Sequence, residues 1–231
     1  MKKNTKYCYT PAQRFEAHGS REYDFGDKRL PSVTTILSRT KDQAFLEKWK
    51  ARVGEEEAER IKNVSSKRGT SMHKFLENHV TDIGYADLSA VGKEARPMAQ
   101  KIIEDGLCNV SEYYGSEVSL YYPDLYAGST DLVCLHNGVE AIVDFKQANR
   151  PKREEWIEDY YLQIAAYAMA HNMMFPRSSK IEKGVIMVCT PDLYYQEFVV
   201  EGPKLQHYYW KFLERLSQYL DQNKAKIRQK V

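Results

Sequence analysis

Hydrophobic and polar positions follow a hairpin pattern in the middle of the chain. Two short apolar runs, residues 132–135 and 141–143, flank the pair Asn137-Gly138. Asn-Gly favours a two-residue type I′ turn, because both central residues of that turn need a positive φ. The pattern therefore predicts a β-hairpin in which His136 faces Val139.

This register predicts that two acidic residues oppose each other. Asp131 falls opposite Asp144, and the Cβ atoms of such cross-strand partners lie about 4.5–5.5 Å apart, where like charges destabilise a sheet. An otherwise apolar strand pair seldom keeps two such carboxylates without a cation between them. Lys146 lies two residues beyond Asp144, so it points from the same face. Two carboxylates and a lysine indicate a site for Mg²⁺ or Mn²⁺ with a positioned general base. The alternative is an exposed sheet face with a simple Lys–Asp ion pair.

The rest of the pattern predicts helices before and after this hairpin. Helices are expected at 33–37, from Asp42, from Lys67, at 87–105, at 154–172 and at 204–228. Strands are expected at 22–25, 113–122, 180–190 and 194–200. A two-residue turn at Pro123-Asp124 would place Glu117 opposite Thr130, away from the Asp131 face, unless a bulge restores it.

This order of elements predicts an α/β fold, with a mixed central sheet flanked by helices. We expect one domain over residues 1–231. It comprises a mainly helical N-terminal part (1–110), a sheet core (111–200) and a C-terminal helix (201–231).

Composition narrows the classes of protein. The 231 residues are 42% hydrophobic and 29% charged, which is typical of a globular protein, and no run approaches the roughly 20 apolar residues of a membrane span. The first residues carry neither an apolar signal core nor an arginine-rich leader, so we expect a cytoplasmic location without a membrane partner. A net charge of +2 means that any nucleic-acid-binding field must be local.

The four cysteines, Cys8, Cys108, Cys134 and Cys189, are scattered and form no C-x-x-C pair. This spacing argues against a disulfide framework and a structural zinc site. It also predicts that the chain has no iron–sulfur cluster.

Four motifs resemble those of the PD-(D/E)XK nuclease superfamily. In chain order they are the segment from Arg68 to His73, Asp131, the Asp144-Phe145-Lys146 triplet, and the segment from Gln163 to Tyr167. Within the superfamily the chain resembles the RecB-like branch, and most of all the exonucleases of the mitochondrial genome maintenance kind and their phage relatives. The segment 31–37 is also similar to that group, and the likeness covers roughly residues 21 to 200.

The resemblance implies a restriction-endonuclease-like core and a role for each motif residue. It implies catalytic residues Asp131, Asp144, Lys146 and Gln163; metal contacts from His73, Asp131, Asp144 and the carbonyl of Phe145; DNA contacts from Arg68 and Tyr167; and a metal or water contact from Glu117. The implied cofactor is Mg²⁺ or Mn²⁺, and the implied partner is DNA.

The preferred hypothesis is a metal-dependent DNA exonuclease acting on single-stranded ends in replication, recombination or repair. We expect a monomer in a bacterial or phage-infected host cell, with replication or recombination proteins as further candidate partners. Two alternatives stay open: an inactive DNA-binding recombination accessory protein, and a metal-dependent hydrolase of small phosphoesters.

Overall fold

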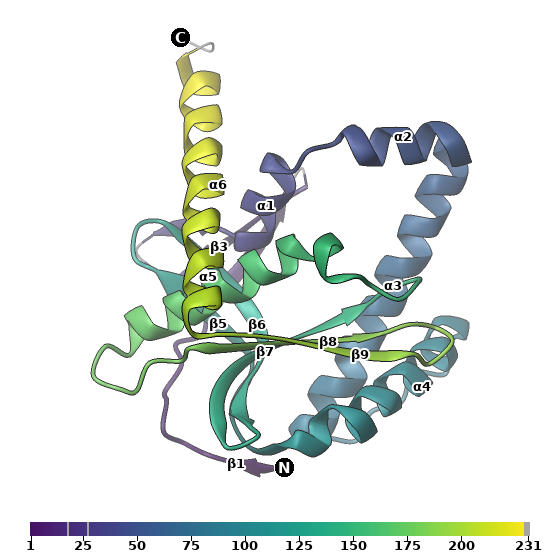
Figure 1. Ribbon diagram of the computed structural model, residues 1–231, viewed down its shortest axis with the longest axis vertical. Helices are drawn as coiled ribbons and strands as arrows, with labels where there is room; N and C mark the ends of the chain where they lie inside the picture. The colour runs from purple at the N-terminus through teal and green to yellow at the C-terminus, as the bar shows by residue number, and fades with distance from the viewer. Residues whose placement is uncertain (18, 27, 229–231) are drawn as a thin grey trace.

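The structure is a computed structural model that describes residues 1–17, 19–26 and 28–228 (Figure 1). The strands are β1 (Lys2–Lys3), β2 (Gln13–Ala17), β3 (Ser20–Asp24), β4 (Arg29–Pro31), β5 (Val110–Tyr122), β6 (Tyr126–His136), β7 (Val139–Gln147), β8 (Lys183–Cys189) and β9 (Tyr195–Glu201). The helices are α1 (Val33–Thr40), α2 (Ala44–Val53), α3 (Glu55–Val80), α4 (Ala90–Asp105), α5 (Glu158–Met174) and α6 (Gly202–Arg228), with short 3₁₀ turns η1 (Leu107–Asn109) and η2 (Glu154–Trp156).

The central sheet is mixed, as the order of elements predicts. Its strand order is β1-β5-β6-β7-β8-β9. Strands β5, β6 and β7 form an antiparallel meander, and β8 runs parallel to β7. Because parallel neighbours need a crossover connection, α5 lies between them in sequence and packs across the sheet. Strand β9 then turns back antiparallel to β8.

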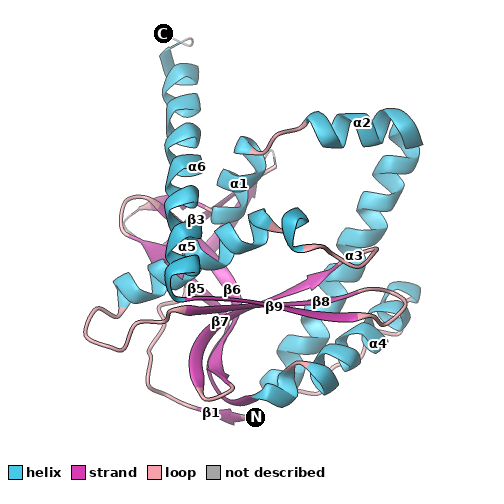
Figure 2. Cartoon of the chain, viewed as in Figure 1, coloured by secondary structure: helices cyan, strands magenta, loops and turns pink. Residues whose placement is uncertain are grey.

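Helices cover both faces of this sheet (Figure 2). On β6, Val133 joins the core shared with α1, α5 and α6, whereas Leu132 and Cys134 join the core shared with α3 and α4. Successive side chains of a strand point to opposite faces, so a nearly continuous apolar run such as that of β6 is buried on both sides. The predicted fold class, a mixed sheet flanked by helices, is confirmed.

The N-terminal part differs from the prediction in two ways. Residues 1–31 contribute four strands: β1 pairs with β5 in the central sheet, while β2, β3 and β4 form a separate antiparallel sheet. Helix α3 starts at Glu55 rather than near Lys67. Gly54, with φ 87°, separates it from α2, and three glutamates in its first turn suit the positive end of the helix dipole.

Residues 41–65 form an arch. The chain leaves α1, passes through α2, and returns along α3 toward the sheet (Figure 1). Beyond the arch, α3 continues to the opposite face, where Met72, Leu76 and Val80 are buried in the core shared with α4. Helix α3 therefore runs past the β6–β7 pair and connects the two sides of the sheet.

The C-terminal helix, expected within 201–231, is α6, and residues 229–231 lie outside the described part. Among the described residues, no helix combines the length and hydrophobicity needed to span a membrane.

Candidate active site

The β6–β7 hairpin has the predicted turn and register. Asn137 and Gly138 adopt φ of 49° and 76°, and the paired positions run from His136–Val139 to Leu132–Val143. The next facing positions are Asp131 and Asp144, and there the described ladder stops.

Beyond that point, a side chain of β6 rather than its main chain accepts the next hydrogen bond from β7. The backbone N–H of Phe145 donates to Oδ2 of Asp131 at 2.6 Å. This bond fixes one oxygen of the carboxylate at the point where the described ladder ends. Both aspartates are buried, with Asp131 8% and Asp144 3% exposed.

Asp144 lies in a network with Lys146 and Gln163. The Lys146 ammonium forms an ion pair with Oδ2 of Asp144 and also donates to Oε1 of Gln163 at 3.1 Å. The Gln163 amide donates to Oδ1 of Asp144 at 3.2 Å. Burial raises the pKa of Asp144, and the Lys146 charge only partly opposes that change. Gln163 of helix α5 thus contacts both charged residues of the D-x-K motif on β7.

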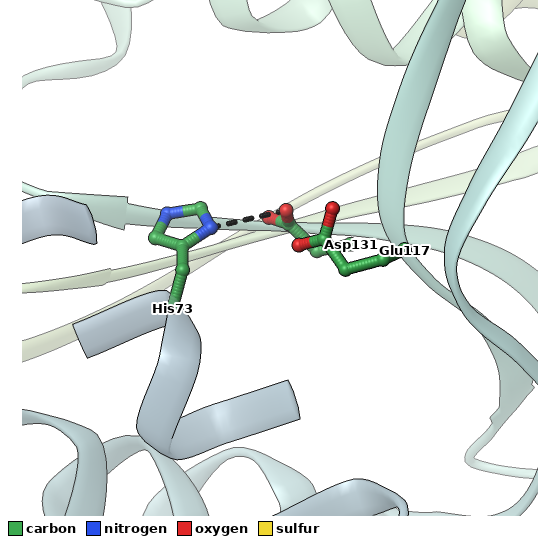
Figure 3. Close-up of side chains that lie close together, drawn as sticks. All are labelled: His73, Glu117 and Asp131. Atoms are coloured by element: carbon green, nitrogen blue, oxygen red, sulfur yellow. Dashed lines mark hydrogen bonds and ion pairs between the residues drawn. The ribbon is translucent and has the colours of Figure 1, made fainter. Parts of the chain in front are cut away.

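His73 approaches Asp131 from α3. Its Nδ1 lies 3.1 Å from Oδ1 of Asp131 (Figure 3). Burial lowers the pKa of His73, but the Asp131 carboxylate more than offsets this, so the pKa is raised to about 9. Without a metal, the Asp131 carboxylate therefore favours the protonated form of His73. A metal at this site would displace that proton, because only a neutral imidazole can be a ligand.

Glu117 also lies at this site, because the turn between β5 and β6 is longer than the two residues expected from the sequence. Tyr122 pairs with Tyr126, so the turn contains three residues, and the flanking pairs leave Glu117 opposite Asp131 rather than Thr130. Glu117 has φ 51°, an irregular backbone at the level of Asp131. Although the Glu117 residue is exposed, desolvation of its carboxyl group and the nearby Asp131 charge raise the pKa of Glu117 to about 7.

His73, Glu117 and Asp131 form a potential metal-binding group. One candidate ligand atom from each lies within 4.8 Å of the others. Figure 3 shows the carboxylate of Glu117 beside that of Asp131, with the imidazole of His73 directed toward them. Two carboxylates and an imidazole suit a divalent cation such as Mn²⁺ or Mg²⁺. Asp144, expected to be a direct ligand, is outside this group and is paired with Lys146 instead.

Tyr167 is buried and does not present a DNA-contacting surface, which corrects its expected role. It is 2% exposed, and its hydroxyl accepts a hydrogen bond from the Gln163 amide at 3.2 Å. A Cβ on Gly128 would lie 2.4 Å from Cε1 of the Tyr167 ring, so glycine leaves room for that ring. Tyr167 thus helps to fix the position of the Gln163 amide through this hydrogen bond.

Arg68 is also buried, so the expected phosphate contact is replaced by structural bonds. Its guanidinium donates to Glu94 on α4 at 3.2 Å and to Oδ1 of Asn149 after β7. Asn149 additionally contacts Ser65. Arg68 therefore ties α3 to α4 and to the end of the strand that carries Asp144 and Lys146.

Sequence reasoning did not single out Asn149 or Tyr160. Asn149 lies in a loop with no periodic pattern, and its bonds to α3 appear only in the folded chain. Tyr160 lies on the same helical stripe as Gln163, which is the one signal for it. The Lys146 ammonium is 5.2 Å from the centre of the Tyr160 ring, within cation–π range.

The fold and the site define the class of protein. A mixed sheet with helices on both faces carries Asp131 and the D-x-K triplet at the open end of a hairpin, with a glutamine from the following helix. This is the arrangement that the PD-(D/E)XK resemblance implies.

Comparisons with known proteins confirm that resemblance. Mitochondrial genome maintenance exonuclease 1 of Mus musculus is 31% identical over 212 residues, covering 84% of this chain and 60% of the relative. The Homo sapiens protein is 28% identical over 216 residues, covering 87% and 61%. The chain thus spans about three fifths of the length of these curated relatives, to which it is similar. No protein-family model matches it.

A structural comparison gives a weaker likeness. Two crystal structures of LHK-Exo, an alkaline exonuclease from Laribacter hongkongensis, are 14% identical to the chain. Their TM-scores are 0.38 and 0.32, over 68% of this chain and 80% and 84% of theirs. An overlap of this size says nothing about the site.

Proposed function

We propose that the chain is a Mg²⁺- or Mn²⁺-dependent DNA exonuclease that hydrolyses phosphodiester bonds at single-stranded ends. The observation that carries the proposal is the facing position of Asp131 and Asp144, both buried, with His73 and Glu117 beside one and Lys146 beside the other. Lys146 compensates Asp144 and a protonated His73 compensates Asp131, which leaves the third carboxyl group, Glu117, without a cation among the described residues. A divalent ion in place of the His73 proton would balance Asp131 and Glu117 together.

Asp131, Glu117 and His73 would hold the metal, and Asp144 and the Phe145 carbonyl would complete its surroundings. A bound divalent cation supplies Lewis-acid polarisation of the scissile phosphate and lowers the pKa of a bound water. The short bond from the Phe145 N–H directs one Asp131 oxygen toward β7 and leaves the other toward His73.

Lys146 would be the side chain that acts directly on the attacking water and the reacting phosphate. Asp144 raises the pKa of the Lys146 ammonium, which outweighs the effect of burial and keeps it charged. A fixed cation there would orient the attacking water and offset the negative charge that builds on the phosphate in the transition state. Gln163 holds Lys146 and Asp144 in one geometry, since it bonds to both.

The arch supports a preference for single strands. His73 lies on the same helix as the end of the arch, so a strand that reaches Asp131 and Lys146 would pass beneath residues 41–65. We propose that a flexible single strand threads under the arch from an end, which a closed circle cannot do. We therefore expect cleavage to begin at a free end.

The test compares linear and circular DNA. A single-stranded oligonucleotide and the same sequence ligated into a circle are incubated with equal enzyme and Mg²⁺, together with linear and circular duplex. The linear single strand should be degraded while the circle persists. Equal loss of the linear and circular single strands would show endonuclease activity and contradict the threading argument.

A further inference from the structure

The segment of residues 149–159, here the base segment, spans the two legs of the arch. At one end the Asn149 amide donates to Oγ of Ser65 on α3 at 2.9 Å. At the other end Lys41, just after α1, pairs with Asp159 at 2.7 Å. Figure 1 shows the start of α5, which this segment enters, lying beneath the arch. A strand that passes under the arch must therefore cross the base segment.

The base segment exposes a large aromatic side chain. Trp156 is 60% exposed, and the Arg153 guanidinium lies over its ring at 5.0 Å from the centroid. The ion pair of Arg153 with Glu155 is long, at 3.8 Å, so it leaves the guanidinium free to stay on the indole. A planar cation on one side and solvent around most of the ring make an open surface for a further planar group.

The backbone around Trp156 is held firmly. Both main-chain groups of Lys152 bond to the side chain of Gln196 on β9, the N–H at 2.6 Å and the carbonyl at 2.8 Å. The N–H of Trp156 donates to the Arg153 carbonyl at 3.0 Å, and the next residue, Ile157, is buried in the core. The exposed indole is thus presented by an ordered segment, which lowers the entropy lost when a ligand binds.

A row of α5 side chains connects Trp156 with the candidate active site. Tyr167 and Gln163 are buried, Tyr160 is half-buried against Lys146, and Trp156 is exposed just before the helix begins. From Gln163 to Glu158, the first residue of α5, the helix axis advances about 7.5 Å, and Trp156 lies two residues further along the chain, at the end of η2. That places the indole within a few nucleotides of a phosphate at Lys146.

The local charge suits a polyanion. Arg150 and Arg153 are exposed, and Lys152 is half-buried between them. Burial and repulsion from Lys41 lower the pKa of Lys152, so two positive groups meet near one leg of the arch. The acid Glu154 is already paired with Lys204 on α6. Glu155, Glu158 and Asp159 are also paired, with Arg153, Lys211 and Lys41. Among the described residues, Arg150 and Lys152 are therefore the bases of this segment that form no ion pair.

We propose that Trp156, backed by Arg153, is a stacking platform for an unpaired base of single-stranded DNA on its way to the site. The proposal rests on the proposed function, because it assigns a binding position for the same substrate. Bases stack on aromatic side chains with little sequence preference, while basic groups hold the backbone. The platform would grip the strand upstream or downstream of the cleaved phosphate and would leave the chemistry at Asp131 and Lys146 unchanged.

The test measures binding of a fluorescein-labelled thymidine oligomer by anisotropy, in Ca²⁺, with cleavage of the same oligomer in Mg²⁺ followed separately. Trp156→Ala should weaken binding by about five- to a hundredfold, and Trp156→Phe should recover most of it. The matched control is Trp210→Ala, because Trp210 on α6 is equally 60% exposed. It should bind like the parent protein.

A second arm uses an abasic version of the oligomer. With no bases to stack, parent and Trp156→Ala should bind it equally, whereas a merely structural role for Trp156 would weaken binding of both oligomers. If Trp156→Ala binds the normal oligomer as tightly as the parent while the parent still cleaves it, the platform is refuted and the proposed function stands. If the parent neither binds nor cleaves the oligomer, both proposals fail.

Discussion

The ring of Tyr167 lies against the α-carbon of Gly128, so that a methyl group on that carbon would be 2.4 Å from Cε1 of the ring. Tyr167 in turn accepts a bond from Gln163, which contacts both Asp144 and Lys146. Gly128 on β6 is therefore linked to the candidate active site through two side chains of α5.

Gly128→Ala should destabilise the protein and slow cleavage. Pushing the buried Tyr167 ring aside costs about 1–3 kcal/mol in a packed core, which lowers the melting temperature by several degrees. Gly84→Ala is the control, because a Cβ there meets no atom within 4 Å. Parent-like melting and cleavage rate for Gly128→Ala would contradict the assigned packing.

Arg68→Lys should slow cleavage more than it weakens substrate binding. Lysine cannot replace the planar guanidinium that contacts Glu94 and Asn149 together. The link between α3 and the end of β7 then loosens, and kcat should fall by about ten- to a hundredfold as His73 moves relative to Asp131. The exposed neighbour Lys67→Ala should retain the parent rate. A rise in KM alone would instead favour a direct phosphate contact by Arg68.

His171 should make stability depend on pH below 6.5. It is buried beside Tyr7 and Tyr9, and burial lowers its pKa to about 4. The unfolded chain takes up this proton near pH 6.5 while the folded chain does not, so the contribution is full above pH 6.5 and is lost as the pH falls toward 4. The loss is at most about 3 kcal/mol.

Urea unfolding of the parent and of His171→Gln at pH 7.5, 6 and 5 isolates this contribution. The parent should lose more unfolding free energy than the variant as the pH falls. Parallel losses in the two proteins would mean that His171 is protonated in the folded state near its ordinary pKa.

Ca²⁺ should support DNA binding but not hydrolysis. It accepts the same oxygen ligands at longer distances and with looser geometry, so a bound water is less acidified and less well aligned. Anisotropy with a labelled oligomer gives the binding, and gel analysis of the same sample gives the cleavage. Cleavage in Ca²⁺ at the Mg²⁺ rate would argue against a geometrically demanding metal site.

Local turn chemistry explains why part of the site was predictable. Asn137-Gly138 determines a two-residue turn, the turn determines the register, and the register brings Asp131 opposite Asp144. The turn at Pro123 has no comparable signal for its length. Its third residue shifts the register by one position and moves Glu117 to the Asp131 side.

Other differences depend on contacts between distant segments. The first half of α3 has no apolar stripe strong enough to indicate a helix, yet it continues from Glu55 without a helix-breaking residue. Arg68 on α3 contacts Glu94 on α4 and Asn149 in the loop after β7. These segments are far apart in the sequence, so the motif around Arg68 could not predict that its side chain is buried. Similarly, the sequence places Tyr167 on the stripe with Gln163, but only packing against Gly128 reveals that its ring is interior.

The most direct test of the central claim is hydrolysis of an end-labelled linear single strand by the parent and by Asp131→Asn. The substitution keeps the shape of the side chain and removes the charge beside His73 and Glu117. We predict products from the parent in Mg²⁺, and none from the parent in excess chelator or from Asp131→Asn in Mg²⁺, although the variant melts as a folded protein. Cleavage by Asp131→Asn, or by the chelated parent, at the parent's Mg²⁺ rate would contradict a metal-dependent site at Asp131.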